Sequence, residues 1–347
     1  MIRRTAALLS LFLFSLLCSL PPPVLDSAGA AAPADERGVG FQTFELRDPV
    51  GGKMMRAVTF YPSDTETKPT AVGPYVVDAT KGAPYLAGRF PLVVFSHGSG
   101  GSRWDVHDFE TYLARHGFVA ASVDHPGDDF QDHSGLGTDK VLIGRPLQMS
   151  ALITRELSDP ATAEHIDPSK AGAAGFSAGG YTALVLAGAR PDFGLLKQYC
   201  RDYPKDSEFC SGWSVQITRP DLSARRDPRV KAVFVMAPVG IYFDRAALDP
   251  VRIPVRIFAA GADHVLPLPA NAERIKSELP NTPEYTVIPK ADHFVFLSPC
   301  SPEMKARRTE ICADPPGVDR AAIHAQIDSG AVRFFSRVFS AHSTASH

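Results

Sequence analysis

The residue with the clearest chemical potential is Ser177, in the segment Gly-Phe-Ser-Ala-Gly-Gly at residues 175–180. The segment matches Gly-x-Ser-x-Gly, a sharp turn from a strand into a helix that exposes a serine hydroxyl above a sheet edge. The serine backbone is strained in such a turn, so the residues two before and two after it must be small. Gly175 and Gly179 meet this requirement. The pattern is short, so its weight depends on the elements around it.

A serine hydroxyl becomes a good nucleophile when an imidazole takes its proton and a carboxylate holds that imidazole. After a turn of this kind the acid and the histidine follow the serine in that order. Asp263 comes just after an expected strand at 255–260, and His293 just after one at 284–288. Active sites of open α/β sheets gather at these carboxyl ends of strands. We therefore predict Ser177, Asp263 and His293 as the catalytic residues.

Alternatives to these assignments remain open. Asp263 could instead be the N-cap of the following helix, since aspartate is a favoured cap. Asp292 and Asp244 are rival acids, and His264 is a rival histidine. Ser177 could be an ordinary turn residue, and the predicted histidine could be a surface residue.

The chain supplies the elements that would position these residues. Short apolar runs bounded by turn residues predict buried strands at 91–96, 118–124, 171–176, 230–236, 255–260 and 284–288. Helices are predicted at 145–157, 178–189, 271–279 and 321–339, with a further one ending at Gly117. Residues 41–47 and 55–61 predict an antiparallel hairpin, 62–89 and 125–144 predict loops, and 191–229 predicts an inserted cap. This alternation predicts a mostly parallel sheet with helices on both faces.

A glycine-rich segment, His-Gly-Ser-Gly-Gly at residues 97–101, follows the first of these buried strands. Its glycines allow backbone N–H groups to point outward, as an oxyanion hole requires. We expect His97 to support this loop rather than to act as the base. His97, Phe176 and Trp213 are assigned to the substrate pocket.

The motifs resemble those of α/β-hydrolases of the dienelactone-hydrolase-like group, close to the bacterial relatives of platelet-activating-factor acetylhydrolase. The matching segments are Phe-Ser-His-Gly-Ser-Gly-Gly at 95–101, Val-Asp-His-Pro-Gly at 123–127, Arg-Pro at 145–146, Asp-Pro-Ser at 167–169, the serine motif, Asp263 with Pro267, and His293. The resemblance implies the α/β-hydrolase fold, with Ser177 as nucleophile, His293 as general base and Asp263 as the orienting acid. It also implies an oxyanion hole made by the backbone N–H groups of Ser99 and Ala178.

The chain departs from both groups in one respect each. The acetylhydrolase places its acid after the preceding strand, where this chain has Met-Ala-Pro at 236–238. The dienelactone-type position, after the next strand, is the one occupied here. True dienelactone hydrolases use a cysteine nucleophile, so their substrate is not carried over.

The N-terminus and the cysteines indicate export. Residues 1–32 combine Arg3 and Arg4 with an apolar run at 6–20 and an alanine-rich stretch at 28–34, as a secretory signal does. An uncleaved membrane anchor is the alternative. Four cysteines follow, and their spacing favours two local disulfides, although three connectivities are possible. The expected pairs are Cys200 with Cys210 and Cys300 with Cys312. We predict a single domain at 33–347 that is secreted or periplasmic, with no stable membrane span after signal cleavage.

Charge and composition exclude several classes of function. Lys and Arg number 36 and Asp and Glu 38, so nothing suggests a nucleic-acid partner. Six acidic and histidine residues crowd one segment: Asp124, His125, Asp128, Asp129, Asp132 and His133. Their spacing fits neither an EF-hand nor a zinc pattern. We predict a solvated loop there, and neither a metal nor a cofactor.

The sequence therefore predicts a serine hydrolase that cleaves a small-molecule carboxylic ester through an acyl-enzyme. Two alternatives stay open: an amidase or peptidase with the same triad, and a non-catalytic binding protein on a hydrolase fold.

Overall fold

The computed structural model describes residues 37–210, 215–219, 221–223 and 226–344. The chain divides into two units, Met1–Ala32 and Pro33–His347, and the described residues all belong to the second. The predicted signal segment at 1–32 and Trp213 lie outside the described residues. In the part of the chain that is described, no helix combines the length and the apolar character needed to cross a membrane.

A nine-stranded sheet forms the centre of the fold. In spatial order its strands are β11 (Glu284–Ile288), β10 (Val255–Ala260), β9 (Val230–Met236), β8 (Ile166–Phe176), β6 (Phe90–Ser96), β7 (Val119–Val123), β2 (Met54–Ser63), β1 (Gly38–Arg47) and β5 (Thr80–Lys81). The six strands from β11 to β7 are parallel to one another. β2 is antiparallel to both β7 and β1. The predicted mostly parallel sheet is confirmed.

The opening hairpin of β1 and β2 forms as expected, and its turn is held by Asp48. The two carboxylate oxygens of Asp48 accept hydrogen bonds from the backbone N–H groups of Val50 and Gly51, at 3.0 and 2.9 Å. The segment 62–89 differs from the predicted loop, because it contains β3 (Thr70–Val72), β4 (Tyr75–Val77) and β5. β3 and β4 pair with each other across Gly73, whose φ is +57°. Strands of two or three residues are too short to show a periodic apolar pattern.

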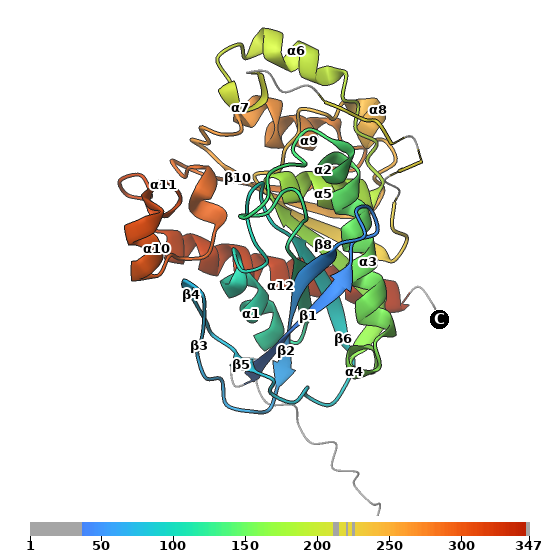
Figure 1. The fold of residues 1–347 in the computed structure, drawn as a ribbon, viewed down its shortest axis with the longest axis vertical. Coiled ribbons are helices and arrows are strands. Elements are labelled where there is room, and N and C mark those ends of the chain that lie inside the picture. Colours follow the sequence, from blue (N-terminus) through green and yellow to red (C-terminus); the bar gives the residue numbers. More distant parts are fainter. Residues whose placement is uncertain (1–36, 211–214, 220, 224–225, 345–347) are drawn as a thin grey trace, which may run out of the picture. The chain divides into compact units, whose positions relative to one another are not determined.

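Helices cover both faces of the sheet (Figure 1). α3 (Gly144–Ser158), α5 (Ala178–Ala187) and α9 (Ala272–Glu278) supply buried apolar residues to one core. α1 (His107–Arg115) and the C-terminal helix α12 (Arg320–Thr344) supply the core on the other face. β8 is poor in branched residues because its neighbours come close: a Cβ at Gly172 would lie 2.6 Å from the ring of Phe335.

Short helices occupy the connections. They are α2 (Asp139–Leu142), α4 (Pro160–Ala163), α6 (Leu195–Asp202), α7 (Ser207–Cys210), α8 (Arg245–Leu248), α10 (Pro302–Arg307), α11 (Thr309–Cys312) and the 3-10 helices η2 (Leu268–Ala270) and η3 (His293–Phe296). α2 lies in the segment predicted as a loop. Both expected disulfides are present: Cys200–Cys210 joins α6 to α7, and Cys300–Cys312 closes the segment that contains α10 and α11.

Candidate active site

Ser177 occupies the turn between β8 and α5 in the strained conformation that the sequence motif predicts. Its φ and ψ are 55° and −117°, in the positive-φ region that side chains disfavour. The neighbouring glycines are required by space. A Cβ at Gly175 would lie 2.1 Å from the carbonyl oxygen of Gly179, and one at Gly179 would lie 1.8 Å from that of Ser96. The turn is therefore possible only with glycine at both positions.

Asp263 and His293 meet at the carboxyl ends of β10 and β11. The Nδ1 atom of His293 lies 2.8 Å from Oδ2 of Asp263, and both side chains are almost fully buried. The other oxygen of Asp263 accepts the backbone N–H groups of Val265 and Leu266 at 3.0 and 2.7 Å. These bonds fix the carboxylate, which in turn favours a proton on Nδ1 and leaves Nε2 of His293 as an acceptor.

The rival residues are engaged elsewhere. Asp292 accepts a hydrogen bond from the ring of the exposed His264 at 2.5 Å and from the backbone N–H of His293 at 2.7 Å. Asp244 caps α8 by accepting the backbone N–H of Ala247 at 2.8 Å. Of the three candidate acids, Asp263 is the one whose carboxylate contacts the His293 ring.

Ser177 and His293 line the same cavity, whose volume is about 350 Å³. Ser99, Ala178 and Phe176 also line it. Its remaining wall is largely apolar and includes Leu136, Val141, Leu142, Tyr181, Leu196, Phe209, Val215, Val239, Tyr242 and Phe294. Leu196 and Phe209 come from α6 and α7, the helices joined by a disulfide. A mostly apolar cavity with a few polar groups is typical of a small-molecule site.

His97 does not line this cavity, in contrast to its assignment as a pocket residue. Its side chain is buried behind the loop, where Nδ1 lies 2.6 Å from the carbonyl oxygen of Gly98 and Nε2 accepts the backbone N–H of His125 at 3.2 Å. Of the three predicted pocket residues, Phe176 lines the cavity, and Trp213 lies outside the described residues.

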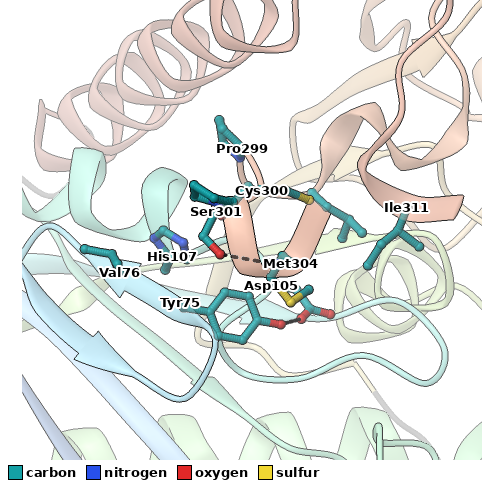
Figure 2. Close-up of a pocket in the computed structure, with 12 residues that line it drawn as sticks. Tyr75, Val76, Asp105, His107, Pro299, Cys300, Ser301, Met304 and Ile311 are labelled. Atoms are coloured by element: carbon teal, nitrogen blue, oxygen red, sulfur yellow. Dashed lines mark hydrogen bonds between the residues drawn. The ribbon is translucent and has the colours of Figure 1, made fainter. Parts of the chain in front are cut away.

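A second cavity, of about 220 Å³, lies beside the Cys300–Cys312 disulfide. Figure 2 shows Tyr75 directed at Asp105, to which its hydroxyl donates a hydrogen bond of 2.9 Å. His107 and Met304 also line this cavity, but none of the three predicted catalytic residues does. The cavity of about 350 Å³ that Ser177 and His293 line is therefore the candidate active site.

Two backbone donors lie beside Ser177, one in the loop at residues 97–101 and one at the start of α5. Among the described residues, the N–H groups of Ser99 and Ala178 donate to no backbone acceptor. The carbonyl oxygen of Gly98, in contrast, accepts both the His97 ring and the backbone N–H of Gly101, the latter at 3.2 Å. Free N–H groups beside a nucleophile can stabilise a negatively charged oxygen.

Most of the acidic segment that follows β7 is not the solvated loop that its composition predicts, although Asp132 is half-buried and His133 is exposed. Asp124, His125, Asp128 and Asp129 are all buried. Asp124 pairs with Arg56 and Arg103, and Asp128 pairs with Arg145. For these four residues the prediction was wrong, and for Asp124 and Asp128 the reason is that their arginine partners lie outside the segment. No group of three potential metal ligands occurs among the described residues.

Sequence reasoning gave Arg145 and Asp128 no role at the site. Both side chains are essentially inaccessible to solvent, and both line the cavity of Ser177. Their pairing distance is 2.7 Å. The sequence did contain one indication that Arg145 is important, because the Arg-Pro pair at 145–146 is among the segments that resemble the hydrolase family.

The fold is similar to that of a solved structure. A ferulic acid esterase from Streptomyces cinnamoneus superposes with a TM-score of 0.63 over 89% of this chain and 92% of that one, at 21% sequence identity. The chain has the α/β-hydrolase fold. In this fold Ser177, Asp263 and His293 follow β8, β10 and β11.

A family comparison agrees over part of the chain. Residues 64–140 match the model described as platelet-activating factor acetylhydrolase, isoform II. That segment contains the loop at 97–101 and Asp128, and it ends before Ser177. No curated protein matches the sequence. The resemblance to hydrolases of this type is thus confirmed, in the segment that carries the glycine-rich loop.

Proposed function

We propose that this α/β-hydrolase is a serine esterase, which cleaves carboxylic esters through an acyl-enzyme. The observation that carries the proposal is a single juxtaposition. A serine in a strained elbow shares a cavity with a histidine whose Nδ1 is held 2.8 Å from a buried carboxylate. That combination is what activates a serine hydroxyl.

The chemistry follows from the roles of these groups. Ser177 Oγ attacks the ester carbonyl carbon while Nε2 of His293 takes its proton, and Asp263 stabilises the resulting imidazolium. The backbone N–H groups of Ser99 and Ala178 bind the oxyanion of the tetrahedral intermediate. His293 then returns the proton to the leaving alcohol, and an acyl-enzyme forms on Ser177. Water, activated by the same histidine, releases the carboxylic acid and restores the serine.

Two similarities favour esters over other acyl compounds. The segment at 64–140 matches a family model named for an acetylhydrolase, and the structural neighbour is named as an esterase. The wall of the cavity is mostly apolar, which suits an uncharged acyl or alcohol group.

The test is Ser177→Ala, assayed on a chromogenic short-chain ester. We expect kcat to fall by about 10⁴-fold or more, because the nucleophile is lost, with the fold unchanged by circular dichroism. Ser158→Ala, at an exposed serine on α3, is the matched control and should keep full activity. Activity retained by Ser177→Ala would refute the assignment.

Parallel assays on matched ester and amide substrates separate an esterase from an amidase or peptidase. Labelling of Ser177 by a fluorophosphonate probe separates either enzyme from a non-catalytic binding protein.

We also propose that the mature protein is secreted or periplasmic. The two disulfides support this, since such bonds persist in oxidising compartments. Mass spectrometry of the exported protein tests it, with a mature N-terminus expected near residue 33 and an intact N-terminus as the contrary result.

A further inference from the structure

The loop that carries the Ser99 N–H is held from behind by a buried ion pair, Asp128 with Arg145. Both side chains have exposed fractions of 1% or less. Asp128 lies in the connection after β7, and Arg145 lies in the first turn of α3. The two residues reach the loop from separate elements.

Asp128 fixes the outer part of the loop with one oxygen and binds Arg145 with the other. Its Oδ1 accepts the hydroxyl of Ser99 at 2.7 Å and the backbone N–H of Gly100 at 2.9 Å. Its Oδ2 accepts Nη1 of Arg145 at 2.7 Å. Both oxygens are therefore committed, and no neutral amide could accept on both sides.

Arg145 fixes the inner part of the loop. Its Nη2 donates to the hydroxyl oxygen of Ser96 at 3.1 Å and to the carbonyl oxygen of His97. The pair thus holds residues on both sides of Gly98. The carbonyl oxygen of Gly98 itself accepts from the His97 ring and from Gly101 N–H.

The bonds that hold the loop around Gly98 determine the direction in which the backbone N–H of Ser99 points. The Gly98–Ser99 peptide is planar and trans, so fixing its carbonyl oxygen on the inner side directs the Ser99 N–H to the opposite side. Ser99 lines the cavity that contains Ser177. An oxyanion hole works because its donors are already oriented before the charge develops.

We propose that Asp128 and Arg145 are positioning residues, which hold the Ser99 N–H in the orientation needed to bind the oxyanion. The inference rests on the proposed function. A buried ion pair is weak evidence for stability, because desolvation offsets much of the attraction. What the pair supplies here is a set of directed bonds to Ser96, His97, Ser99 and Gly100.

The decisive variant is Asp128→Asn, since the amide offers one acceptor oxygen where the carboxylate uses two. Either the bonds to the loop or the bond to Arg145 must break. We expect kcat on a short-chain ester to fall about 10- to 100-fold, with KM changed less than about threefold.

A pair of inhibitors separates positioning from a general loss of fit. Ser177 Oγ adds to the carbonyl carbon of an alkyl trifluoromethyl ketone, the serine proton passes to His293, and the former carbonyl oxygen becomes an oxyanion. The corresponding secondary alcohol has the same chain and forms no oxyanion. In Asp128→Asn, the Ki of the ketone should rise by about the same factor as kcat/KM falls, and the Ki of the alcohol should stay constant.

Asp227→Asn is the matched control, since Asp227 is a buried aspartate paired with Arg229 at a distance from the cavity. It should leave kcat and both Ki values unchanged. A folded Asp128→Asn protein with normal kcat, or with both inhibitors weakened equally, would overturn the proposal.

If Asp128→Asn fails to fold, Ser99→Ala is the second test. It removes the hydrogen bond from the Ser99 hydroxyl to Asp128 and leaves the Asp128–Arg145 ion pair intact. We expect about a 3- to 10-fold fall in kcat with a matching rise in the ketone Ki. Unchanged values would refute the positioning role. If the wild-type protein forms no ketone adduct at Ser177, it is the proposed function that fails.

Discussion

Two buried polar clusters contain histidines, which are neutral in one cluster and positively charged in the other. The first cluster lies behind the oxyanion loop and contains His97 and His125. The second lies between α1 and α12 and contains His324. All three side chains are almost fully buried. Burial alone therefore does not decide the protonation of a histidine in this molecule.

In the first cluster each ring has one donor partner and one acceptor partner. His125 donates from Nδ1 to the side-chain oxygen of Gln148 at 2.7 Å and accepts the hydroxyl of Ser96 at Nε2, at 2.9 Å. His97 likewise donates to Gly98 and accepts from His125 N–H. A neutral imidazole satisfies this pattern completely. Burial and the nearby Arg145 charge hold the pKa of both rings well below the usual value.

In the second cluster both nitrogens of His324 face acceptors. Nδ1 lies 2.5 Å from Oδ2 of Asp108, and Nε2 lies 2.8 Å from the carbonyl oxygen of Val295. Only the imidazolium can donate to both. Burial acts to lower the pKa of His324, but the Asp108 carboxylate outweighs it and raises the pKa to about 9.

The two clusters differ in which of their groups change protonation between neutral and alkaline pH. Around the oxyanion loop, Asp128 pairs with Arg145, and His97 and His125 stay neutral. Between α1 and α12, His324 faces Asp108 and Asp328, with His107 and Glu110 on the same helix as Asp108. Burial and the Asp108 charge raise the pKa of Asp328 to about 8. We expect the first cluster to set geometry and the second to make stability depend on pH.

The largest effect should come from breaking the first cluster with Arg145→Met. The substitution keeps an unbranched chain but leaves the Asp128 carboxylate buried without a counter-charge. We expect a loss of about 3–5 kcal/mol in the free energy of unfolding at pH 7, measured by urea denaturation. Arg252→Met, at a pair with Asp249 in which both side chains are more than half exposed, should cost less than about 1 kcal/mol. Equal losses in the two variants would contradict the distinction between the sites.

A smaller and pH-dependent effect is expected from His324→Gln in the second cluster. The folded pKa of about 9 lies above the ordinary value of 6.5. The charged ring therefore stabilises the fold fully below pH 6.5, and this stabilisation is lost as pH rises through about 9. We expect a loss of about 2 kcal/mol at pH 6 that shrinks markedly by pH 9.5.

Denaturation of wild type and His324→Gln at both pH values measures this difference. The exposed His133→Gln serves as control and should differ little from wild type at either pH. A constant loss across the range would show that the ring acts through packing rather than charge.

The sequence predicted the sheet and the triad positions for a physical reason. Buried parallel strands are continuous apolar runs, and each of the six predicted runs became a strand of the central sheet. The positions of Asp263 and His293 follow from chain order, since both come directly after such strands. Their assignment as catalytic residues remains a prediction.

The long-range partnerships could not be predicted. Asp124 and Asp128 look like solvated residues because the arginines that neutralise them, Arg56, Arg103 and Arg145, come from other elements. The inward position of His97 likewise depends on a residue outside its own segment, His125, whose backbone N–H its ring accepts. Composition describes a residue's neighbours in the chain, whereas burial of a charge depends on neighbours in space.

The smallest effect concerns Glu110 on α1, a member of the second cluster that no charge neutralises. It is fully buried, and neither carboxylate oxygen has a hydrogen-bond partner among the described residues. The hydroxyl of Ser122 donates to the carbonyl oxygen of Arg103 instead. Burial, together with Asp108 and Asp105, raises the pKa of Glu110 well above 4.5.

Glu110→Gln should therefore stabilise the protein. In the unfolded chain Glu110 ionises near pH 4.5, whereas in the folded chain it stays protonated, so wild type loses stability as pH rises above that value. Glutamine has no such proton to retain. We expect a gain of about 1–2 kcal/mol at pH 7.5 and little change at pH 4.5, measured by calorimetry at both values. Glu164→Gln, at an exposed side chain, should change stability little at either pH. A gain of equal size at both values would mean that Glu110 is limited by packing rather than by its charge.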